Sequence, residues 1–331
     1  MDKKAAFEIQ FNWVFVLVAG TLILVFFSAV ILKQKSSSEI VTSNLILKNI
    51  EAIFSGAEAS RNTINTVNIP ETKLEFGCNE YRIGKLSRQF NSISLFAPSE
   101  IQANKLITWT LDWSIPYRVT NFLYLSSPET RYVFFGQDTK KYFDLMPNET
   151  SKAFYGTQAD FEDRGFDELR IITTDALAAN TAFQGKKKVT ALKLDANAGK
   201  LEFFEFDKAL GNFRNTGNSF YLEDSSLFGA VFSDDAEMYK CSMENAFRRL
   251  NLISTIYIEK TNSLRSFYSA PPNANTNCAA RHDSQYISAI KSNSASFSSI
   301  DSSKISGILS ASGSLEQQNK EAQLYSCAMI Y

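Results

Sequence analysis

The chain has 331 residues, of which 44% are hydrophobic, and its 34 lysines and arginines nearly balance its 35 aspartates and glutamates. The formal net charge of −1 argues against the basic surface that phosphate recognition needs, so we expect no nucleic-acid partner. We interpret the short basic run at residues 186–188 as a solvated turn. The 27 phenylalanines give the chain enough apolar surface to build a substantial core.

The first feature along the chain is an uncharged apolar stretch from Phe11 to Leu32. At about 1.5 Å per residue, a helix of this length exceeds the roughly 30 Å hydrocarbon core of a bilayer. Lysines flank the stretch at positions 3, 4, 33 and 35, and a tryptophan near one end suits the lipid–water boundary. We therefore predict a transmembrane helix with the lipid bilayer as a partner. The anchor residues include Phe11, Trp13, Gly20 and Leu32.

The same stretch has two other interpretations, a buried core helix and a cleaved secretory signal. Core helices rarely stay apolar at every position over such a length. A signal peptide has an apolar region of about 7–15 residues followed by a small-residue cleavage site. The candidate site here, Ser28-Ala29-Val30, ends poorly and lies inside the apolar stretch. We therefore favour an uncut, single-pass signal anchor.

The side of the membrane that holds the rest of the chain is predicted from two weaker features. The flanking lysines are balanced, so the positive-inside rule does not orient the helix. An even number of cysteines and one glycosylation sequon, Asn148-Glu149-Thr150, together favour an extracytoplasmic body at the cell membrane. Three pairings are open to the disulfide candidates Cys78, Cys241, Cys278 and Cys327. A cytosol-facing body with reduced cysteines is the alternative.

We divide the chain into four regions. Residues 1–35 form a short tail and the transmembrane helix, 36–60 a juxtamembrane stalk helix, 61–270 an extracytoplasmic mixed α/β body, and 271–331 a loop with C-terminal helices packed on the body. The juxtamembrane region shows apolar residues at helical spacing, with Ser38 and Glu39 at a plausible start and Gly56 at a plausible end. This helix either extends the membrane helix as a stalk or folds back onto the body.

The next part of the chain is rich in residues that favour strands. Leu74 and Phe76 alternate with charged residues, which predicts a strand with one buried face. Pro116 interrupts a long run of β-formers and predicts either two strands or a strand and a turn. Trp109 and Trp113 lie four residues apart, so a strand places both on one face, where we expect them in the core.

The middle of the body alternates strand and helix patterns. RYVFFGQ reads as a buried strand, DTKKYFDLM as a short helix and DELRIITTDA as another strand. This succession predicts a βαβ unit and a parallel sheet. Residues 195–199, DANAG, predict a hairpin turn because Asn and Gly accept positive φ. We expect β structure to continue through SFYLEDSSLFGAVF.

A change of period after residue 232 predicts a long helix. Ser233, Asp234 and Asp235 are good capping residues, and apolar residues then recur at helical spacing. Cys241 lies on the apolar face, either as a buried thiol or in a disulfide to the later loop. The serine-rich remainder predicts two weak helices that cover the sheet or reach a partner. The fold class is therefore mixed α/β (α+β): a long N-terminal helix followed by a mixed-sheet globular body with flanking helices.

The chain has few residue patterns that are typical of catalysis or metal binding. The chain has one histidine, His282, so a site with two or three histidine ligands is excluded within one chain. Cys278 lies four residues before it, but Cys–His catalysis needs a free thiol, and we expect a surface histidine instead. Acidic residues at 160, 162 and 163 do not match calcium-loop spacing, and those at 234, 235 and 237 are explained by helix capping. We predict no metal and no cofactor.

The N-terminal sequence KKAAFEIQFNWVFVLVAG resembles the start of archaeal pilin-like membrane proteins. Those proteins carry a basic region, a short polar stretch with Gln and Glu, and then a long apolar helix. The resemblance implies that a membrane peptidase trims the basic part and that the apolar helices bundle into a filament core. In this chain Glu8 precedes Gln10, and no small-residue cleavage site sets Glu8 at the fifth position of a mature chain. The body is similar in style to uncharacterised single-pass archaeal proteins, which implies a surface location.

From these features we predict a non-enzymatic, membrane-anchored cell-surface protein with a structural or protein-interaction role. Its expected partners are other surface proteins or copies of itself. One alternative is a pilin-like filament subunit, from which the residues before about Phe7 are removed. Another is a membrane-tethered extracytoplasmic hydrolase, which requires converging carboxylates or a reactive cysteine in a pocket.

Overall fold

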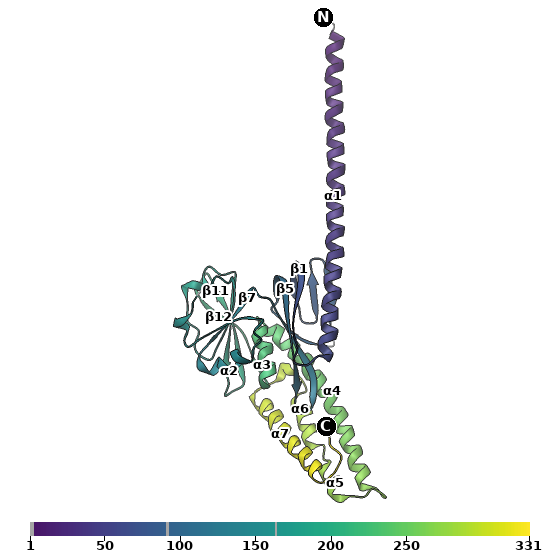
Figure 1. Ribbon diagram of the computed structural model, residues 1–331, viewed down its shortest axis with the longest axis vertical. Coiled ribbons are helices and arrows are strands. Elements are labelled where there is room, and N and C mark those ends of the chain that lie inside the picture. The colour runs from purple at the N-terminus through teal and green to yellow at the C-terminus, as the bar shows by residue number, and fades with distance from the viewer. Residues whose placement is uncertain (1–2, 91–92, 163) are drawn as a thin grey trace. The chain divides into compact units, whose positions relative to one another are not determined.

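The computed structural model describes residues 3–90, 93–162 and 164–331, with the side chains of residues 3–15, 35–40 and 58 also outside the description. Contacts within the chain divide it into two units, Met1–Ile50 and Glu51–Tyr331. The second unit is a mixed α+β body with two sheets and several helices (Figure 1). The predicted mixed class is confirmed, although the strands form two sheets where one was expected.

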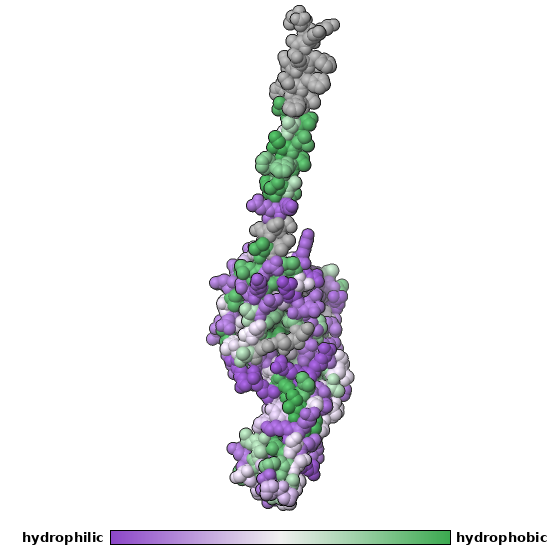
Figure 2. Space-filling view, turned by 90° about the vertical axis from the view of Figure 1, so that its right-hand side faces the viewer, coloured by the Kyte–Doolittle hydropathy of each residue, from purple (hydrophilic) through white to green (hydrophobic). Residues whose placement is uncertain are grey.

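Helix α1 runs without interruption from Lys3 to Ala59, past both predicted boundaries at Ser38 and Gly56. Its segment Val16–Gln34 is 19 residues long, has a mean hydropathy of 2.5 and has no buried residues. Figure 2 shows apolar side chains covering the face in view along this segment. By length and composition the segment fits a membrane anchor or a signal peptide.

The end of α1 is capped within the second unit. The carbonyl groups in the last turn of a helix have no intrahelical donors, so they need other partners. The buried amide of Asn121 donates to the carbonyl oxygens of Ala57, at 3.0 Å, and Ser60, at 2.6 Å. Phe54 of the same turn packs edge-on against Tyr81 and Phe90, with ring centroids 5.2 and 5.4 Å away.

The first sheet, sheet A, has the strand order β3-β2-β1-β5-β6-β4. Its strands are β1 (Ile64–Phe76), β2 (Glu80–Ile83), β3 (Leu86–Gln89), β4 (Ser94–Phe96), β5 (Glu100–Ser114) and β6 (Arg118–Ser126). All neighbours are antiparallel except β4 and β6. Pro116 lies between β5 and β6, as predicted, because proline lacks the N–H that a central strand requires. Leu74 and Phe76 are both buried, which confirms the one-sided strand.

The second sheet, sheet B, has the strand order β12-β11-β10-β9-β7-β8. Its strands are β7 (Thr130–Phe135), β8 (Ser151–Tyr155), β9 (Glu168–Thr173), β10 (Lys188–Asp195), β11 (Lys200–Asp207) and β12 (Asn212–Phe220). Strands β7 to β10 are parallel, which confirms the predicted parallel sheet. Helix α2 (Lys140–Leu145) links β7 to β8, an edge strand that the sequence pattern missed. The chain then returns past β7 to β9, so the connections reverse direction between β7 and β9.

The predicted hairpin joins β10 and β11. Asp195 Oδ1 accepts hydrogen bonds from the backbone N–H groups of Asn197 and Ala198, both at 3.1 Å. Gly199 has a φ of +62°, a conformation that most other residues adopt only with strain. The turn residues themselves therefore encode this connection.

Helices form the rest of the body. They are α3 (Glu223–Phe232), α4 (Ala236–Ser269), α5 (Thr276–Arg281), α6 (Gln285–Asn293) and α7 (Ser302–Leu324). The prediction of β structure through residues 223–232 is wrong, because this segment is α3. Every residue from Ser226 to Phe232 is buried. A helix buried on all sides shows no polar face, so its period cannot be seen in the sequence.

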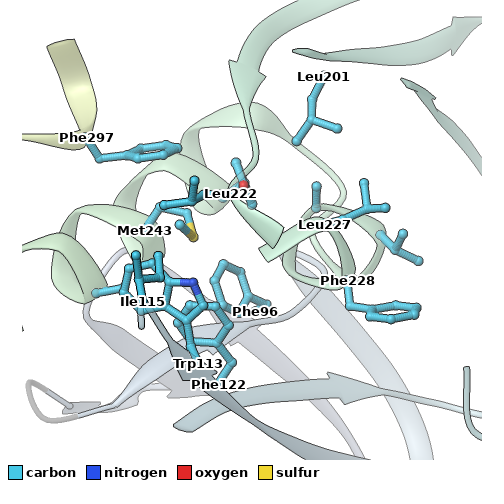
Figure 3. Packing of buried hydrophobic residues seen from close by; sticks show 14 of the residues in the cluster. Phe96, Trp113, Ile115, Phe122, Leu201, Leu222, Leu227, Phe228, Met243 and Phe297 are labelled. Atoms are coloured by element: carbon cyan, nitrogen blue, oxygen red, sulfur yellow. The ribbon is translucent and has the colours of Figure 1, made fainter. Parts of the chain in front are cut away.

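One hydrophobic core joins both sheets to α3 and α4. Trp113 is fully buried and stacks between Phe122 of sheet A and Phe247 of α4, with ring centroids 5.2 and 5.9 Å away. Figure 3 shows Trp113, Phe122 and Phe96 beneath Met243 of α4. Trp109 is also buried, so the predicted core role of both tryptophans is confirmed.

The opposite face of sheet B carries a second core cluster. Its buried members are Val133, Phe135, Leu169, Ile171, Phe183, Val189, Ala191 and Phe206. Tyr132 and Phe134 alternate with the first two and enter the main core instead. Burial on both faces explains why the β7 sequence is continuously apolar.

Candidate functional site

The predicted anchor residues lie along α1. Gly20 is exposed and Leu32 is 67% exposed, both inside the apolar segment Val16–Gln34. The side chains of Phe11 and Trp13 lie outside the described residues. The segment thus presents apolar side chains that no other part of the described chain covers.

All four cysteines are in disulfides, Cys78–Cys241 and Cys278–Cys327. Cys241 is therefore tied to the β1–β2 turn, which is neither the buried thiol nor the disulfide to the later loop that the sequence left open. Helix position alone does not reveal the partner, because the bonded cysteines are 163 residues apart in the chain. Disulfides of this kind fit an extracellular protein.

His282 is completely buried, so the expectation of a surface histidine is wrong. Its Nδ1 lies 2.8 Å from the carbonyl oxygen of Cys278, and its Nε2 lies 2.8 Å from that of Ala328. The ring also stacks on Tyr268, with centroids 5.3 Å apart. These contacts fasten the C-terminal segment next to the Cys278–Cys327 bond. The predicted Cys–His neighbours do meet, but as structural groups.

The other disulfide lies in a cleft of about 850 Å³ beside α4. Its lining includes Asp235, side chains of α4 from Glu237 to Arg248, and one wall formed by Cys78 and Asn79 of the β1–β2 turn. The end of β12 and the 3₁₀ turn η4 (Phe297–Ser299) also line it.

Hydrogen bonds across this cleft, which we call the α4 cleft, hold its walls in place. Asn245 Nδ2 of α4 donates to Asn79 Oδ1 at 2.6 Å. Glu244 Oε2 accepts from the backbone N–H of Ser298 at 3.1 Å and from the hydroxyl of Ser296 at 3.1 Å. The lining mixes acidic, basic and apolar groups. It therefore suits a polar surface of another molecule better than a purely apolar ligand.

A network of charged residues, the Asp234 network, lies where the parallel strands of sheet B begin. Asp234 is 9% exposed and accepts hydrogen bonds from the backbone N–H of Ser99 at 3.0 Å and from its hydroxyl at 2.8 Å. It also forms an ion pair with Lys188. Burial acts to raise the pKa of Asp234, but Lys188 and Ser99 outweigh it, and the pKa lies below its ordinary value.

These positions correct two predictions. Lys186 is 6% exposed and Lys188 is engaged by Asp234, so the basic run is not a solvated turn. Only Asp235 of the second acidic cluster caps α4, where it accepts from the N–H of Met238 at 2.8 Å. Burial first, and then the neighbouring charge of Asp234, raise the pKa of Asp235, although the hydrogen bond from Met238 opposes them.

Arg170 completes the network from strand β9. It is 2% exposed, and it donates from Nη2 to the carbonyl oxygen of Ala230 at 2.8 Å and from Nε to that of Val231 at 3.2 Å. The guanidinium thus caps the C-terminal end of α3. Burial lowers the pKa of Arg170 to about 10, so the group is still protonated at neutral pH. The sequence gives only one hint of this role, an arginine inside an apolar strand pattern.

A second cleft, of about 580 Å³, opens where the parallel strands end. Asp138 follows β7 and Thr174 follows β9, while Lys193 near the end of β10 and Lys200 at the start of β11 also line the cleft. In open sheets with parallel strands, ligands bind outside the carboxyl ends where the connections reverse direction, and that point lies between β7 and β9 here. Glu202 lies 2.8 Å from Lys200 and 3.8 Å from Lys193. The lining holds as many acids as lysines, so no single ligand charge is favoured.

The remaining predicted sites lie on the surface. Asn148 is exposed on a turn after α2, and Thr150 of its sequon donates to the carbonyl oxygen of Pro147 at 2.6 Å. Asp160 closes a capping box with Thr157, and Glu162 pairs with Arg164 at 3.1 Å. Asp163 lies outside the described residues. In the part of the chain that is described, no group of three or more His, Cys, Asp or Glu side chains could hold a metal ion.

No protein-family model, no curated protein and no solved structure matches this chain.

Proposed function

We propose that this chain is a membrane-anchored protein of the cell surface whose extracytoplasmic body has a structural or protein-interaction role. The observation that carries the proposal is the segment Val16–Gln34, which is 19 residues long, apolar and without a buried residue. So much uncovered apolar surface is costly in water and is stabilised in a bilayer.

The location of the body rests on its cysteines and its sequon. Disulfides such as these two are typical of an oxidising compartment, and Asn148 is exposed on a turn. An interaction role is supported by the α4 cleft, whose mixed lining resembles the polar composition of protein–protein contacts. The expected partners are other surface proteins or further copies of this chain.

Membrane anchoring is tested by replacing Leu24, near the centre of the apolar segment, with arginine. Leu24→Arg costs about 3–4 kcal/mol for insertion, because arginine is strongly disfavoured at the centre of a bilayer-spanning helix. We expect a large loss of protein from the carbonate-resistant membrane fraction. The matched control is Leu45→Arg, another exposed leucine of α1 but outside the apolar segment. Equal loss in both variants, or in neither, would contradict the anchor.

Orientation is tested by intact mass with and without Asn148→Gln in the native host. We expect a heavier protein that loses the extra mass in the variant, together with disulfide-linked peptides. An unmodified Asn148 and four free thiols would place the body in the cytosol and contradict the proposal.

The same mass measurement separates the pilin-like alternative. Loss of the residues before about Phe7 would indicate peptidase processing and favour a filament subunit. A full-length N-terminus supports the uncut anchor.

A further inference from the structure

The two disulfides lie in opposite surroundings. Cys278 and Cys327 are 2% and 7% exposed and pack with Tyr268 and Ala322. Cys78 is exposed and Cys241 is half-buried, and both line the α4 cleft. A reductant in solution therefore reaches Cys78–Cys241 directly, whereas Cys278–Cys327 must become exposed before it can react.

The exposed bond holds a peripheral element. The β1–β2 turn carries Cys78, and strands β2 and β3 beyond it form the outer edge of sheet A. Among the described residues, this turn is linked to α4 by the disulfide and by the hydrogen bond between Asn79 and Asn245. A single neutral hydrogen bond contributes little to stability, so the disulfide is the stronger of these two links between the turn and α4.

We propose that Cys78–Cys241 is a redox-sensitive clamp on the α4 cleft, opened by an external dithiol under conditions in which Cys278–Cys327 stays oxidised. One thiolate of the dithiol attacks the Cys78 sulfur, the bond to Cys241 breaks, and Cys241 leaves as a thiolate. The second thiolate of the reagent then attacks the mixed disulfide and releases Cys78. Two electrons pass to the protein, the two protons of the dithiol end on the cysteines, and the reagent becomes a cyclic disulfide.

Opening frees the β1–β2 turn from α4 and widens the cleft, while the core and the distal helices keep their packing. The clamp depends on the proposed function in one respect, because an extracytoplasmic location allows the Cys78–Cys241 bond to form. The experiments use purified protein, so their results do not depend on which side of the membrane holds the body.

The first experiment follows the order of reduction. The full-length protein in detergent micelles is treated with increasing dithiothreitol, alkylated, then fully reduced, alkylated with a heavy reagent and mapped by mass spectrometry. We expect Cys78 and Cys241 to be labelled in the first step at a rate about tenfold or more above that of Cys278 and Cys327, since a buried bond reacts only after local opening. Parallel reduction of both bonds, or earlier reduction of Cys278–Cys327, would overturn the proposal.

The second experiment measures the conformational result by hydrogen exchange. Selective reduction should speed exchange in residues 77–83 and in the first turns of α4, with residues 130–135 and 276–281 unchanged. The double variant Cys78→Ser with Cys241→Ser should show the same pattern without reductant and no further response to it. Unchanged exchange at residues 77–83 after confirmed reduction would show that the bond is not a clamp. Because the wild-type chain supplies both readouts, the test does not depend on the variant folding.

Discussion

The two edges of the parallel strands in sheet B use charge in opposite ways. At the edge where the strands begin, Arg170 and Asp234 are buried. Lys188 and Ser99 contact the Asp234 carboxylate, and helix carbonyls accept hydrogen bonds from Nε and Nη2 of Arg170. At the edge where the strands end, lysines and acids surround an open cleft. The side chains of Lys193 and Lys200 there are 36% and 37% exposed.

This difference separates residues that stabilise the fold from residues that are available to a ligand. A buried charge must keep its partners, because losing one leaves an unpaired group away from water. An exposed charge is already solvated, so its removal costs little. The first edge should therefore be sensitive to substitution and the second edge tolerant.

The largest effect is expected for Arg170→Met. This change removes both donors to the carbonyls of Ala230 and Val231 and leaves the end of α3 uncapped. We expect a loss of about 3–5 kcal/mol in the free energy of unfolding, measured by urea titration of the full chain in detergent. Arg170→Lys keeps the charge without the two-pronged geometry and should lie in between. If Arg170→Met were as stable as wild type, the buried charges where the strands begin would not be needed to stabilise the fold.

The next effect is expected for Asp234→Asn, at about 2–4 kcal/mol near neutral pH, because Lys188 loses its charged partner. The pKa of Asp234 is lower in the folded chain than its ordinary value of 3.8. Ionised Asp234 therefore stabilises the fold fully above that value, and the contribution is lost as the pH falls below it. The difference between wild type and variant should shrink in urea titrations below pH 3.8. A difference that stays constant into that range would contradict the assignment.

A smaller effect is expected at the opposite edge for Gly136→Ala. Gly136 directly follows β7 and has a φ of +85°. A Cβ at this position would lie 3.4 Å from Asp175 Oδ2. We expect a loss of about 1–2 kcal/mol from backbone strain, read from the thermal unfolding midpoint. Gly185→Ala, with open space and no positive φ, is the matched control. Equal midpoints for the two variants would show that the Gly136 conformation carries no strain.

The smallest effect is expected for Lys193→Ala. The side chain is 36% exposed and lies 3.8 Å from Glu202, so solvent screens the pair. We expect a change of less than about 0.5 kcal/mol in urea titration. A loss as large as that of Asp234→Asn would mean that the two edges do not differ.

Features that depend on a few successive residues can be predicted from the amino-acid sequence. The apolar stretch before Lys33 predicted a long N-terminal apolar helix, and Pro116 predicted the break between two strands. Turn residues at 195–199 encoded the β10–β11 hairpin, and Asp235 encoded the start of α4. In each case the relevant atoms lie within a few residues of one another, so local chemistry is sufficient.

Features that need residues far apart in the chain depend on how the segments pack. Cys78 and Cys241 are 163 residues apart, and their pairing follows from the packing of sheet A on α4. His282 is buried where the C-terminal segment brings Ala328 against it, and the helical period of α3 is hidden because its residues from Ser226 to Phe232 are all buried. The same holds for Arg170, whose acceptors lie 60 and 61 residues further along the chain. Burial and partner choice depend on which segments meet in space, and the pattern along one segment does not contain that information.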